Sequence, residues 1–270
     1  MSKARQNFIF DIVAAFMMLS RLPFGWCKFE SKNQPQLDTA GWAFPLVGLV
    51  IGAGGAAGLV AFQMAGVTPI GAATIGIIIM TVLSGAIHDD GLADMADGFG
   101  GGLSAEDKIQ IMHDSRVGSY GVLALCLGTI LRVSLLSSLC TLPLRPGALI
   151  MLIAFFVAAS RWQILTLLQR FPVSNKARLG QLVRSPPLSQ FIVATCLWLL
   201  PVSIVFGPIT GSILAVSAFI SAICIGKLAM SQIGGLTGDI MGASVIVSEI
   251  SMMLTLIMLT SFFPDTLGVL

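Results

Sequence analysis

The sequence predicts an all-α fold, a polytopic integral membrane helical bundle that forms a single domain over residues 1–270. Two observations lead to this prediction. The 270 residues are 56% hydrophobic and only 10% charged, whereas soluble domains carry about 25% charged residues. Several stretches also reach the roughly 20 mostly apolar residues that a helix needs to cross a bilayer. No stretch shows the alternation over about ten residues that is typical of a membrane barrel.

The composition also excludes several classes of protein. Disordered chains are poor in large apolar residues and rich in charge, which is the reverse of this sequence. The 15 basic residues barely exceed the 13 acidic ones, so no basic excess is available to neutralise the phosphates of a nucleic acid. The five cysteines form no CxxC pair, which argues against a zinc site or a disulfide framework.

Seven stretches are predicted to cross the membrane, because each is apolar over about the required length. In chain order they are residues 41–64, 70–88, 118–142, 147–168, 190–207, 209–230 and 242–263. The earlier apolar stretch 8–22 is shorter and is interrupted by Asp11. We expect it to form an interfacial or re-entrant helix that does not cross. The alternative is an eighth span, which would place the N-terminal charges on the side opposite the connections 89–117 and 169–189.

The charges between these stretches indicate an orientation. With seven crossings, the N-terminus and the connections 23–40, 89–117, 169–189 and 231–241 share one side. Arg145 is the one basic residue outside the apolar stretches that falls on the other side. Because loops rich in Lys and Arg stay in the cytoplasm, we expect these connections to be cytoplasmic. Their basic residues are Lys3, Arg5, Lys28, Lys32, Lys108, Arg116, Arg170, Lys176, Arg178 and Arg184.

Glycines at four-residue spacing predict places where membrane helices approach each other closely. We expect this packing role for two pairs in the first predicted span, and a third run lies beside Asp239. The glycines are Gly48 and Gly52, Gly54 and Gly58, and Gly234, Gly238 and Gly242.

The acidic residues are concentrated in one connection. Asp90, Asp94 and Asp97 stand at i, i+4 and i+7, which places them on one face of a helix; we expect this helix to continue from the span 70–88. Like charges at this spacing repel unless a cation lies among them, and Mg²⁺ is typically held by carboxylates together with substrate phosphates. These three aspartates are therefore the predicted metal ligands, and a solvated acidic loop is the alternative. Seven of the 13 carboxylates lie here: Asp89, Asp90, Asp94, Asp97, Glu106, Asp107 and Asp114.

A glycine-rich segment and a polar segment follow the aspartates. The run Gly98-Phe99-Gly100-Gly101-Gly102 could bring backbone amides close to a phosphate, or it could be a simple flexible turn. The next segment is Asp114-Ser115-Arg116-Val117-Gly118-Ser119-Tyr120-Gly121. The planar cation of Arg116 suits phosphate oxygens. Asp114 could be a further metal ligand, a base, or the cap of a helix that begins near Gly118.

Other ionisable residues lie near the cluster or inside apolar spans. His88 and His113 border the aspartates, and Asp239, preceded by Thr237, falls on the same predicted side as they do. Placing an ionisable residue within a span costs free energy, so such a residue is a functional candidate by default. Glu249 is one of these candidates. By the same argument Arg132 should pair with a carboxylate or line a cavity, whereas Arg161 could extend to the membrane interface.

These residues together resemble the cobalamin synthase family, the adenosylcobinamide-GDP ribazoletransferases. The most specific part is the aspartate segment from His88 to Gly98, followed by the segment from Asp114 to Gly121. Shorter matching segments are Leu19-Ser20-Arg21-Leu22-Pro23, Phe44-Pro45-Leu46-Val47-Gly48 and Gly235-Leu236-Thr237-Gly238-Asp239 with Gly242-Ala243. Asp89 departs from the family pattern, which commonly has an apolar residue there, and His113 stands at a position that is often basic.

The resemblance implies a multi-pass enzyme of the bacterial cytoplasmic (inner) membrane, with its active-site loops in the cytoplasm. It would be a Mg²⁺-dependent transferase of substituted phosphate groups, a single catalytic domain that joins adenosylcobinamide-GDP to α-ribazole or α-ribazole 5′-phosphate. The products would be adenosylcobalamin, or its 5′-phosphate, and GMP. Its partners would be these substrates and the lipid bilayer; a homo-oligomer, or association with other enzymes of cobamide assembly, stays open.

The sequence and the resemblance together give a set of candidate site residues. Asp90, Asp94 and Asp97 would link Mg²⁺ to the pyrophosphate, and Asp114, Asp239 or His88 would deprotonate the attacking hydroxyl. The candidate catalytic residues are His88, Asp90, Asp94, Asp97, Asp114, Arg116 and Asp239. The candidate substrate-binding residues are Arg21, Gly98, Gly100, Gly101, Ser115, Tyr120 and Thr237.

Two other functions fit parts of the pattern. A CDP-alcohol phosphotransferase also uses spaced aspartates in a membrane-embedded site, but its later aspartates at four-residue spacing have no counterpart after Asp97. A divalent cation transporter would bind its cargo at an acidic cluster, although transporter carboxylates usually lie near the midplane of repeated halves. Release of CMP from a lipid substrate would indicate the first function, and ion flux without nucleotide would indicate the second.

Overall fold

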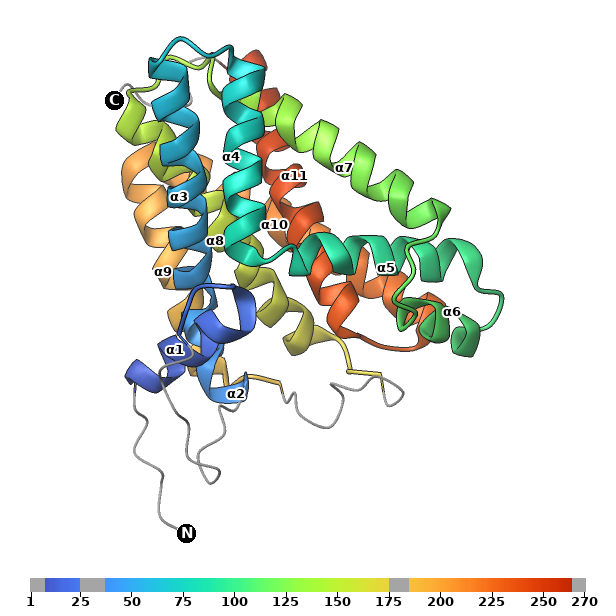
Figure 1. Ribbon diagram of the computed structural model, residues 1–270. Helices are drawn as coiled ribbons and strands as arrows, with labels where there is room; N and C mark the ends of the chain where they lie inside the picture. Colours follow the sequence, from blue (N-terminus) through green and yellow to red (C-terminus); the bar gives the residue numbers. More distant parts are fainter. Residues whose placement is uncertain (1–7, 25–36, 175–184, 264–270) are drawn as a thin grey trace.

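The computed structural model describes residues 8–24, 37–174 and 185–263, and these residues form a bundle of helices (Figure 1). Some of the basic residues that predict the orientation lie outside the described residues: Lys3, Arg5, Lys28, Lys32, Lys176, Arg178 and Arg184.

The long helices confirm the predicted spans. Six are long and apolar enough to cross a membrane, and a seventh span results if the bent pair α4 and α5 counts as one. The long helices are α3 (Phe44–Met64, preceded by the 3₁₀ turn Gly41–Ala43), α4 (Pro69–Ser84), α7 (Ser119–Leu139), α8 (Pro146–Arg170), α9 (Leu188–Phe206), α10 (Pro208–Ile233) and α11 (Gly238–Phe262). The chain is therefore a multi-pass membrane protein with an all-helical bundle.

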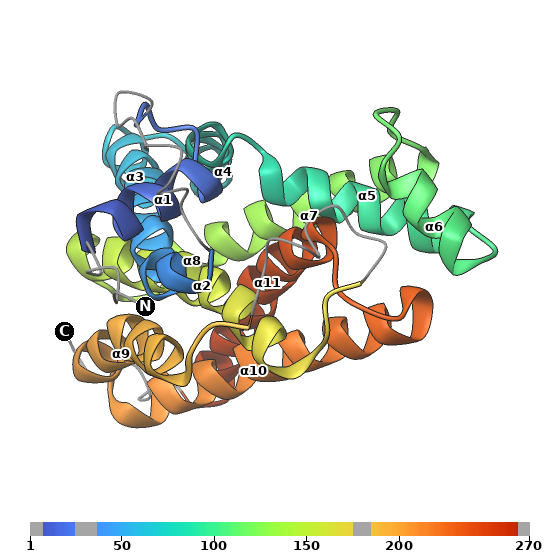
Figure 2. The ribbon, with the colours of Figure 1, turned by 90° about the horizontal axis from the view of Figure 1, so that it is seen from below.

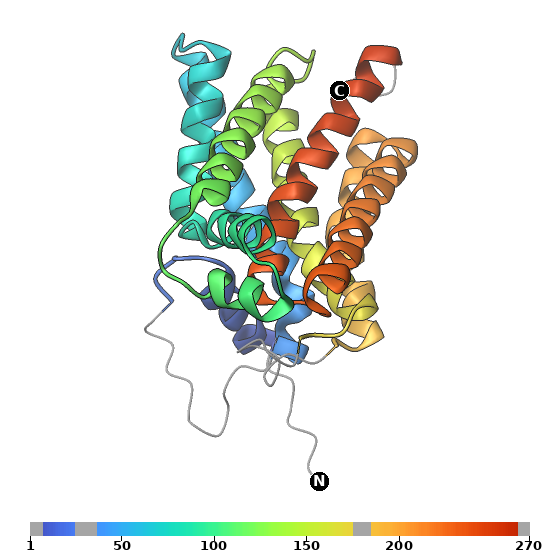
Figure 3. The ribbon, with the colours of Figure 1, turned by 90° about the vertical axis from the view of Figure 1, so that its right-hand side faces the viewer.

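The connections alternate between the two ends of the bundle, as the seven-span prediction requires. The α3–α4 and α7–α8 connections and the end of α11 lie at one end (Figures 1 and 3). The short helices α1 (Phe8–Leu19) and α2 (Leu37–Ala40) lie at the other end, with the end of α8. At 12 residues, α1 is about 18 Å long and too short to cross a bilayer of about 30 Å.

Local signals in the sequence explain where these helices begin and end. Thr68 caps α4 by accepting a hydrogen bond from the amide of Gly71, and Pro69 follows at the first helical position. Thr237 caps α11 in the same way, with the amide of Ile240 as donor. Gly234 ends α10 in the left-handed conformation, with φ of 72°, where a residue without Cβ is favoured.

The glycine pairs of α3 pack against its neighbours, as predicted. A Cβ added at Gly48 would lie 2.3 Å from the carbonyl oxygen of Val157 on α8, so the two helices are in backbone contact there. Gly52 faces Ala154 and Val157 of α8, while Gly54 and Gly58 face side chains of α4. Small residues at this spacing thus pack α3 against both helices.

The helix that carries the aspartates does not continue from α4, so that part of the prediction is wrong. Gly85 and Ala86 both have positive φ, 69° and 58°, and they end α4 at Ser84. The next helix, α5 (Ile87–Gly101), leaves at 90° to α4. Two consecutive left-handed residues cannot belong to a right-handed helix, and this is the physical reason for the break.

The predicted connection 89–117 is largely helical. Helix α5 is followed by α6 (Ala105–Met112), and both extend sideways from the bundle (Figure 2). Ser104 and Asp107 form a capping box at the start of α6. At the same end of the bundle, Val173 pairs with Leu236 in an isolated parallel bridge, which joins the end of α8 to the segment before α11.

Candidate active site

Helix α5 presents the predicted aspartates in the expected helical phase. Asp90, Asp94 and Asp97 all lie within its 15 residues. Asp90 is exposed, Asp94 is half-buried and Asp97 is buried, so the row of carboxylates runs from solvent into the contact with α7. The prediction of three aspartates on one helix is confirmed.

A close crossing of α5 and α11 brings Asp239 to this row. A Cβ added at Gly91 would lie 2.7 Å from the carbonyl oxygen of Asp239, and one added at Gly242 would lie 3.3 Å from the carbonyl oxygen of Ile87. Because both helices have a glycine at the crossing, their backbones touch. The third glycine run, of which Gly242 is the last member, therefore serves to place Asp239 beside the α5 aspartates.

The electrostatics of Asp94 show how close these carboxylates are. Partial burial and the neighbouring charges of Asp90, Asp239 and Asp97 raise the pKa of Asp94 to about 7. Among the residues that the structure describes, neither Asp90 nor Asp94 has an ion-pair partner. No ion pair therefore offsets the repulsion at Asp90 and Asp94, although the charge of His113 acts on Asp239 and favours the ionised form of that carboxyl.

The carboxylate oxygens of this cluster suit a divalent cation such as Mg²⁺ that is bound together with the phosphates of a substrate. In the described parts of the chain, no three His, Cys, Asp or Glu side chains are arranged so that they could hold a metal ion by themselves. Mg²⁺ usually takes only one or two carboxylates from the protein and completes its shell with water and substrate phosphates. Asp90 and Asp94, which are uncompensated and reach solvent, match that requirement.

Asp97 has a different environment from the other two aspartates. Its Oδ2 accepts a hydrogen bond from the amide of Gly118 at 2.7 Å, and its Oδ1 accepts one from the amide of Gly121 at 2.8 Å. Both oxygens are thus engaged by the first turn of α7. Capping of this turn was one of the roles predicted for Asp114, but Asp97 performs it.

Asp114 and Arg116 form an exposed ion pair in the loop between α6 and α7. The Arg116 guanidinium lies 2.7 Å from Asp114 Oδ2, and the Arg116 side chain is 87% exposed. Hydrogen bonds from Arg116 lower the pKa of Asp114, which makes this carboxylate a weaker base. Arg116 and the neighbouring Ser115 are exposed. The end of their loop is held against α5 by the hydrogen bond from the Gly118 amide to Asp97.

The glycines after Asp97 do not form the predicted phosphate-binding loop. Gly98, Gly100 and Gly101 lie in the last turns of α5, where an amide donates to the carbonyl four residues earlier. A Cβ at Gly100 would lie 2.6 Å from the Tyr120 ring, and one at Gly98 would lie 2.5 Å from Met112. Close packing on α6 and α7 explains why Gly98 and Gly100 are glycine.

The remaining candidates occupy three different places. His88 is buried, with its Nε2 unpartnered within the described structure, and lies two residues from Asp90, about 200° around the helix. Thr237 caps α11 and lies 3.4 Å from Asp239 Oδ2. Arg21 is exposed; its amide donates to Leu83 at 2.9 Å, and its side chain lies over Gly85 at the break between α4 and α5.

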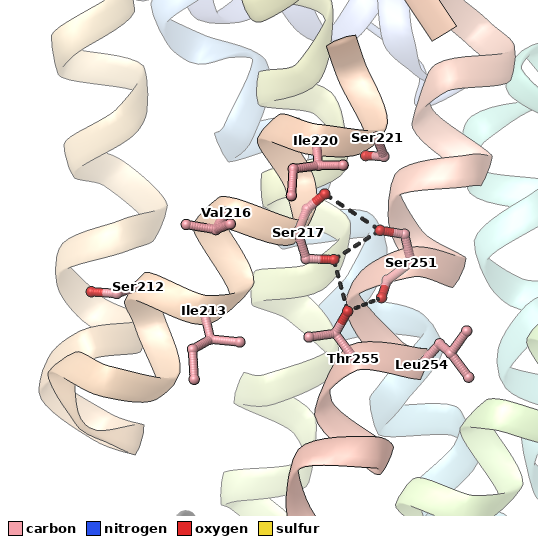
Figure 4. A pocket seen from close by; sticks show the side chains of 9 residues that line it. All are labelled: Ser212, Ile213, Val216, Ser217, Ile220, Ser221, Ser251, Leu254 and Thr255. Atoms are coloured by element: carbon pink, nitrogen blue, oxygen red, sulfur yellow. Dashed lines mark hydrogen bonds between the residues drawn. The ribbon is translucent and has the colours of Figure 1, made fainter. Parts of the chain in front are cut away.

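A separate groove of about 550 Å³ lies between α10 and α11 (Figure 4). Three of its hydroxyls bond to each other, with Ser217 Oγ lying 2.8 Å from Ser251 Oγ and 2.9 Å from Thr255 Oγ1. No charged side chain lines it. Ser251 is 12 residues from Asp239 on one helix, about 18 Å along its axis, so this groove is not part of the aspartate site.

The sequence did not reveal a set of buried ion pairs beneath the site. Arg132 pairs with both Asp89 and Glu249, which confirms the prediction that it would pair with a carboxylate. Arg161 is also buried and pairs with Glu249, so it does not extend to the interface. The presence of these charges inside apolar spans was the available signal, but their partners could not be deduced from it.

Comparison with known proteins places the chain in a family. The sequence model of the family described as cobalamin-5-phosphate synthase matches residues 11–257. A relative from Bradyrhizobium diazoefficiens, named adenosylcobinamide-GDP ribazoletransferase, is 32% identical over 92% of this chain and 94% of its own length. Relatives of the same name from Azorhizobium caulinodans and a Sinorhizobium species are 33% and 34% identical, over 90% and 92% of this chain and 94% and 95% of their own. No solved structure matches the chain. Since the family model covers nearly all of the described helices, the chain belongs to the cobalamin-5-phosphate synthase family.

Proposed function

We propose that this protein is an adenosylcobinamide-GDP ribazoletransferase, which joins adenosylcobinamide-GDP to α-ribazole or α-ribazole 5′-phosphate and releases GMP. The names of its relatives support the reaction. The observation that carries the proposal is the crossing of α5 and α11, which places Asp239 beside Asp90 and Asp94. This cluster of acids, on the helix to which Asp97 holds the loop of the exposed Arg116, suits a substrate that contains a pyrophosphate.

Asp90 and Asp94 are the proposed ligands of Mg²⁺. Both carboxylates lack a basic partner within the described structure, and the raised pKa of Asp94 reflects its partial burial together with the negative charge around it. When bound there, Mg²⁺ would supply neutralisation of the pyrophosphate charge, which is a major part of catalysis in phosphoryl transfer. Asp97 is reassigned from metal ligand to anchor of α7, because both of its oxygens accept amide hydrogen bonds.

The reaction needs one bond to form and one to break at the phosphorus next to cobinamide. The ribose hydroxyl of α-ribazole attacks this phosphorus, a new P–O bond forms, and the bond to the GMP oxygen breaks. Arg116, which is exposed and planar, binds phosphate oxygens. Asp239 takes the proton of the hydroxyl, because Asp114 is bound to Arg116 and His88 lies on the buried side of α5.

The proposed location is the cytoplasmic membrane of a bacterium, with α5, α6 and the start of α11 on the cytoplasmic side. The support is the distribution of basic residues over the elements: Lys108 lies on α6, Arg116 lies in the loop before α7 and Arg170 ends α8, whereas Arg145 precedes the first residue of α8 at the opposite end of that helix. This asymmetry matches the positive-inside rule.

The test is an assay of the purified protein in lipid vesicles with adenosylcobinamide-GDP, α-ribazole and Mg²⁺, with GMP and the cobamide product quantified by chromatography. We expect equimolar GMP and cobamide, and neither product when EDTA replaces Mg²⁺. Parallel reactions contain a CDP-activated lipid with an alcohol acceptor. CMP release there, with no GMP from the cobinamide substrate, would refute the proposal.

A further inference from the structure

Three buried charged residues, Arg132, Arg161 and Glu249, form a continuous network with the half-buried Asp89 inside the bundle. Arg132 Nη1 donates to Asp89 Oδ1 at 3.0 Å, and Arg132 Nη2 donates to Glu249 Oε2 at 2.9 Å. Arg161 donates to the other oxygen of Glu249, and Ser160 Oγ donates to the same oxygen at 3.2 Å. The four charged residues come from α5, α7, α8 and α11, so the network links the aspartate helix to three spans.

The charges of this network balance. Two arginines face two carboxylates, and the side chains of Arg132, Arg161 and Glu249 are each only 4% exposed, with Asp89 at 17%. Buried ion pairs rarely stabilise a protein more than apolar residues of similar volume, whereas removal of one partner leaves a costly unpaired charge. Stability alone therefore gives a poor account of why four charges are buried here, and a role in positioning gives a better one.

The position of Asp89 on α5 shows what the network controls. Asp89 and Asp90 are consecutive residues, so they point about 100° apart around the helix. Asp89 points inward to Arg132, while Asp90 is exposed. The break at Gly85 and Ala86 separates α5 from α4, so α4 does not hold α5 at a fixed rotation. The glycine contact with α11 brings the backbones together but supplies no side chain that would prevent rotation. Asp97 holds the C-terminal half of α5 through the amides of Gly118 and Gly121, whereas Asp89 is the side chain that forms an ion pair from its first turn.

We propose that Asp89 and Arg132 are positioning residues, and that the network of Asp89, Arg132, Glu249 and Arg161 fixes the rotation of the N-terminal half of α5 about the helix axis, as Asp97 does for the other half. This rotation directs Asp90 and Asp94 toward the ligand and away from the bundle. The inference rests on the proposed function only in taking Asp90 and Asp94 as cation ligands.

Three variants separate positioning from stability. Asp89→Asn removes one charge and leaves the network with an excess positive charge. Asp89→Asn combined with Arg132→Gln removes both charges and leaves Glu249 paired with Arg161. Asp11→Asn is the matched control, because Asp11 is also buried but bonds to Trp42 from α1, outside the network. Each protein is purified in detergent and measured for thermal unfolding, for binding of Mn²⁺ alone by electron paramagnetic resonance, and for hydrogen exchange of residues 87–101.

The positioning role predicts that stability and cation binding separate. Asp89→Asn should unfold at a lower temperature, exchange faster in α5 and bind Mn²⁺ roughly 10-fold more weakly, the usual scale for losing a residue that orients metal ligands. The double variant should recover most of the unfolding temperature but keep the weak binding and fast exchange, while Asp11→Asn should bind like wild type.

The proposal is overturned if Asp89→Asn binds Mn²⁺ and exchanges like wild type, or if the double variant recovers binding and exchange together with stability. Should Asp89→Asn fail to fold, the double variant and Asp89→Glu, which keeps the charge on a longer side chain, decide by the same readouts. If wild type binds no Mn²⁺, the proposed cation site fails, and the exchange of α5 still decides the positioning role.

Discussion

Gly91 on α5 lies against the backbone of Asp239 on α11, so closely that an added Cβ would be 2.7 Å from the Asp239 carbonyl oxygen. This contact joins two segments far apart in the sequence and assembles the acidic site from them. It also explains why a glycine directly follows Asp90: any larger residue would separate the carboxylates of α5 from that of Asp239.

The first prediction concerns this contact. Gly91→Ala should force α5 and α11 apart at a cost of about 1–3 kcal/mol, the usual range for overpacking, and should lower both the unfolding temperature and GMP release. Gly101→Ala is the matched control on the same helix, since its Cβ would meet only Ile111 at 3.5 Å, an ordinary contact. Thermal unfolding in detergent and the GMP assay compare the two. Equal behaviour of the two variants would contradict the role of the crossing.

The second prediction separates Asp97 from Asp94. Asp97→Asn loses one of two amide hydrogen bonds at the start of α7, so hydrogen exchange at residues 118–122 should rise. The affinity for Mn²⁺ should stay within about threefold of wild type, because both proposed ligands, Asp90 and Asp94, are intact. Asp94→Asn should show the reverse pattern, with weak Mn²⁺ binding and unchanged exchange in α7. A loss of Mn²⁺ affinity in Asp97→Asn as large as that in Asp94→Asn would restore Asp97 as a ligand.

The third prediction is a dependence of stability on pH. The pKa of Asp94 is raised from 3.8 to about 7, so between these values the folded state holds a proton that the unfolded state has lost. Asp94 therefore lowers the free energy of unfolding progressively as the pH rises through this window. Without divalent cations, Asp94→Asn should unfold at a higher temperature than wild type at pH 8, and the difference should shrink at pH 5. Thermal melts at both pH values measure it, and a variant less stable than wild type at pH 8 would be inconsistent with the unbalanced charge.

The fourth prediction concerns Arg116, whose ion pair with Asp114 is exposed. Such pairs contribute only about 0–1 kcal/mol, so Arg116→Gln should leave the unfolding temperature nearly unchanged. It should nevertheless raise the KM for adenosylcobinamide-GDP by roughly 10-fold or more, the scale of a lost charged hydrogen bond of about 1.5–3 kcal/mol. Arg145→Gln, an exposed arginine at the other end of the bundle, is the control. A KM like that of wild type in Arg116→Gln would exclude Arg116 from phosphate binding.

The sequence was sufficient for the spans and for the packing of α3. A crossing helix needs a long apolar run, and the predicted 41–64 and 147–168 match the observed Gly41–Met64 and Pro146–Arg170. The pair Gly48 and Gly52 indicated a close contact, and α8 supplies it. These features depend on local composition and spacing, which can be read directly.

The parts of the site that depend on distant contacts could not be read in this way. Gly85 was a possible signal for the end of a helix, but Ala86 adopts a left-handed conformation that its residue type does not favour, so the 90° turn into α5 could not be predicted. Gly98 and Gly100 looked like a loop because their helical packing partners, Met112 and Tyr120, come from other elements. Arg132 was expected to find a carboxylate, but its partners lie 43 and 117 residues away in the chain, and no spacing rule identifies them.

The central claim is that the α5 carboxylates bind the cation with which the phosphate chemistry is performed. The most direct measurement is Mg²⁺-dependent GMP release from adenosylcobinamide-GDP and α-ribazole by Asp94→Asn, with Asp107→Asn as the control for removal of a nearby acid on α6. The account predicts a loss of at least about 100-fold for Asp94→Asn, the upper scale for a metal-site residue, and activity near that of wild type for Asp107→Asn. Full Mg²⁺-dependent GMP release by Asp94→Asn would contradict it.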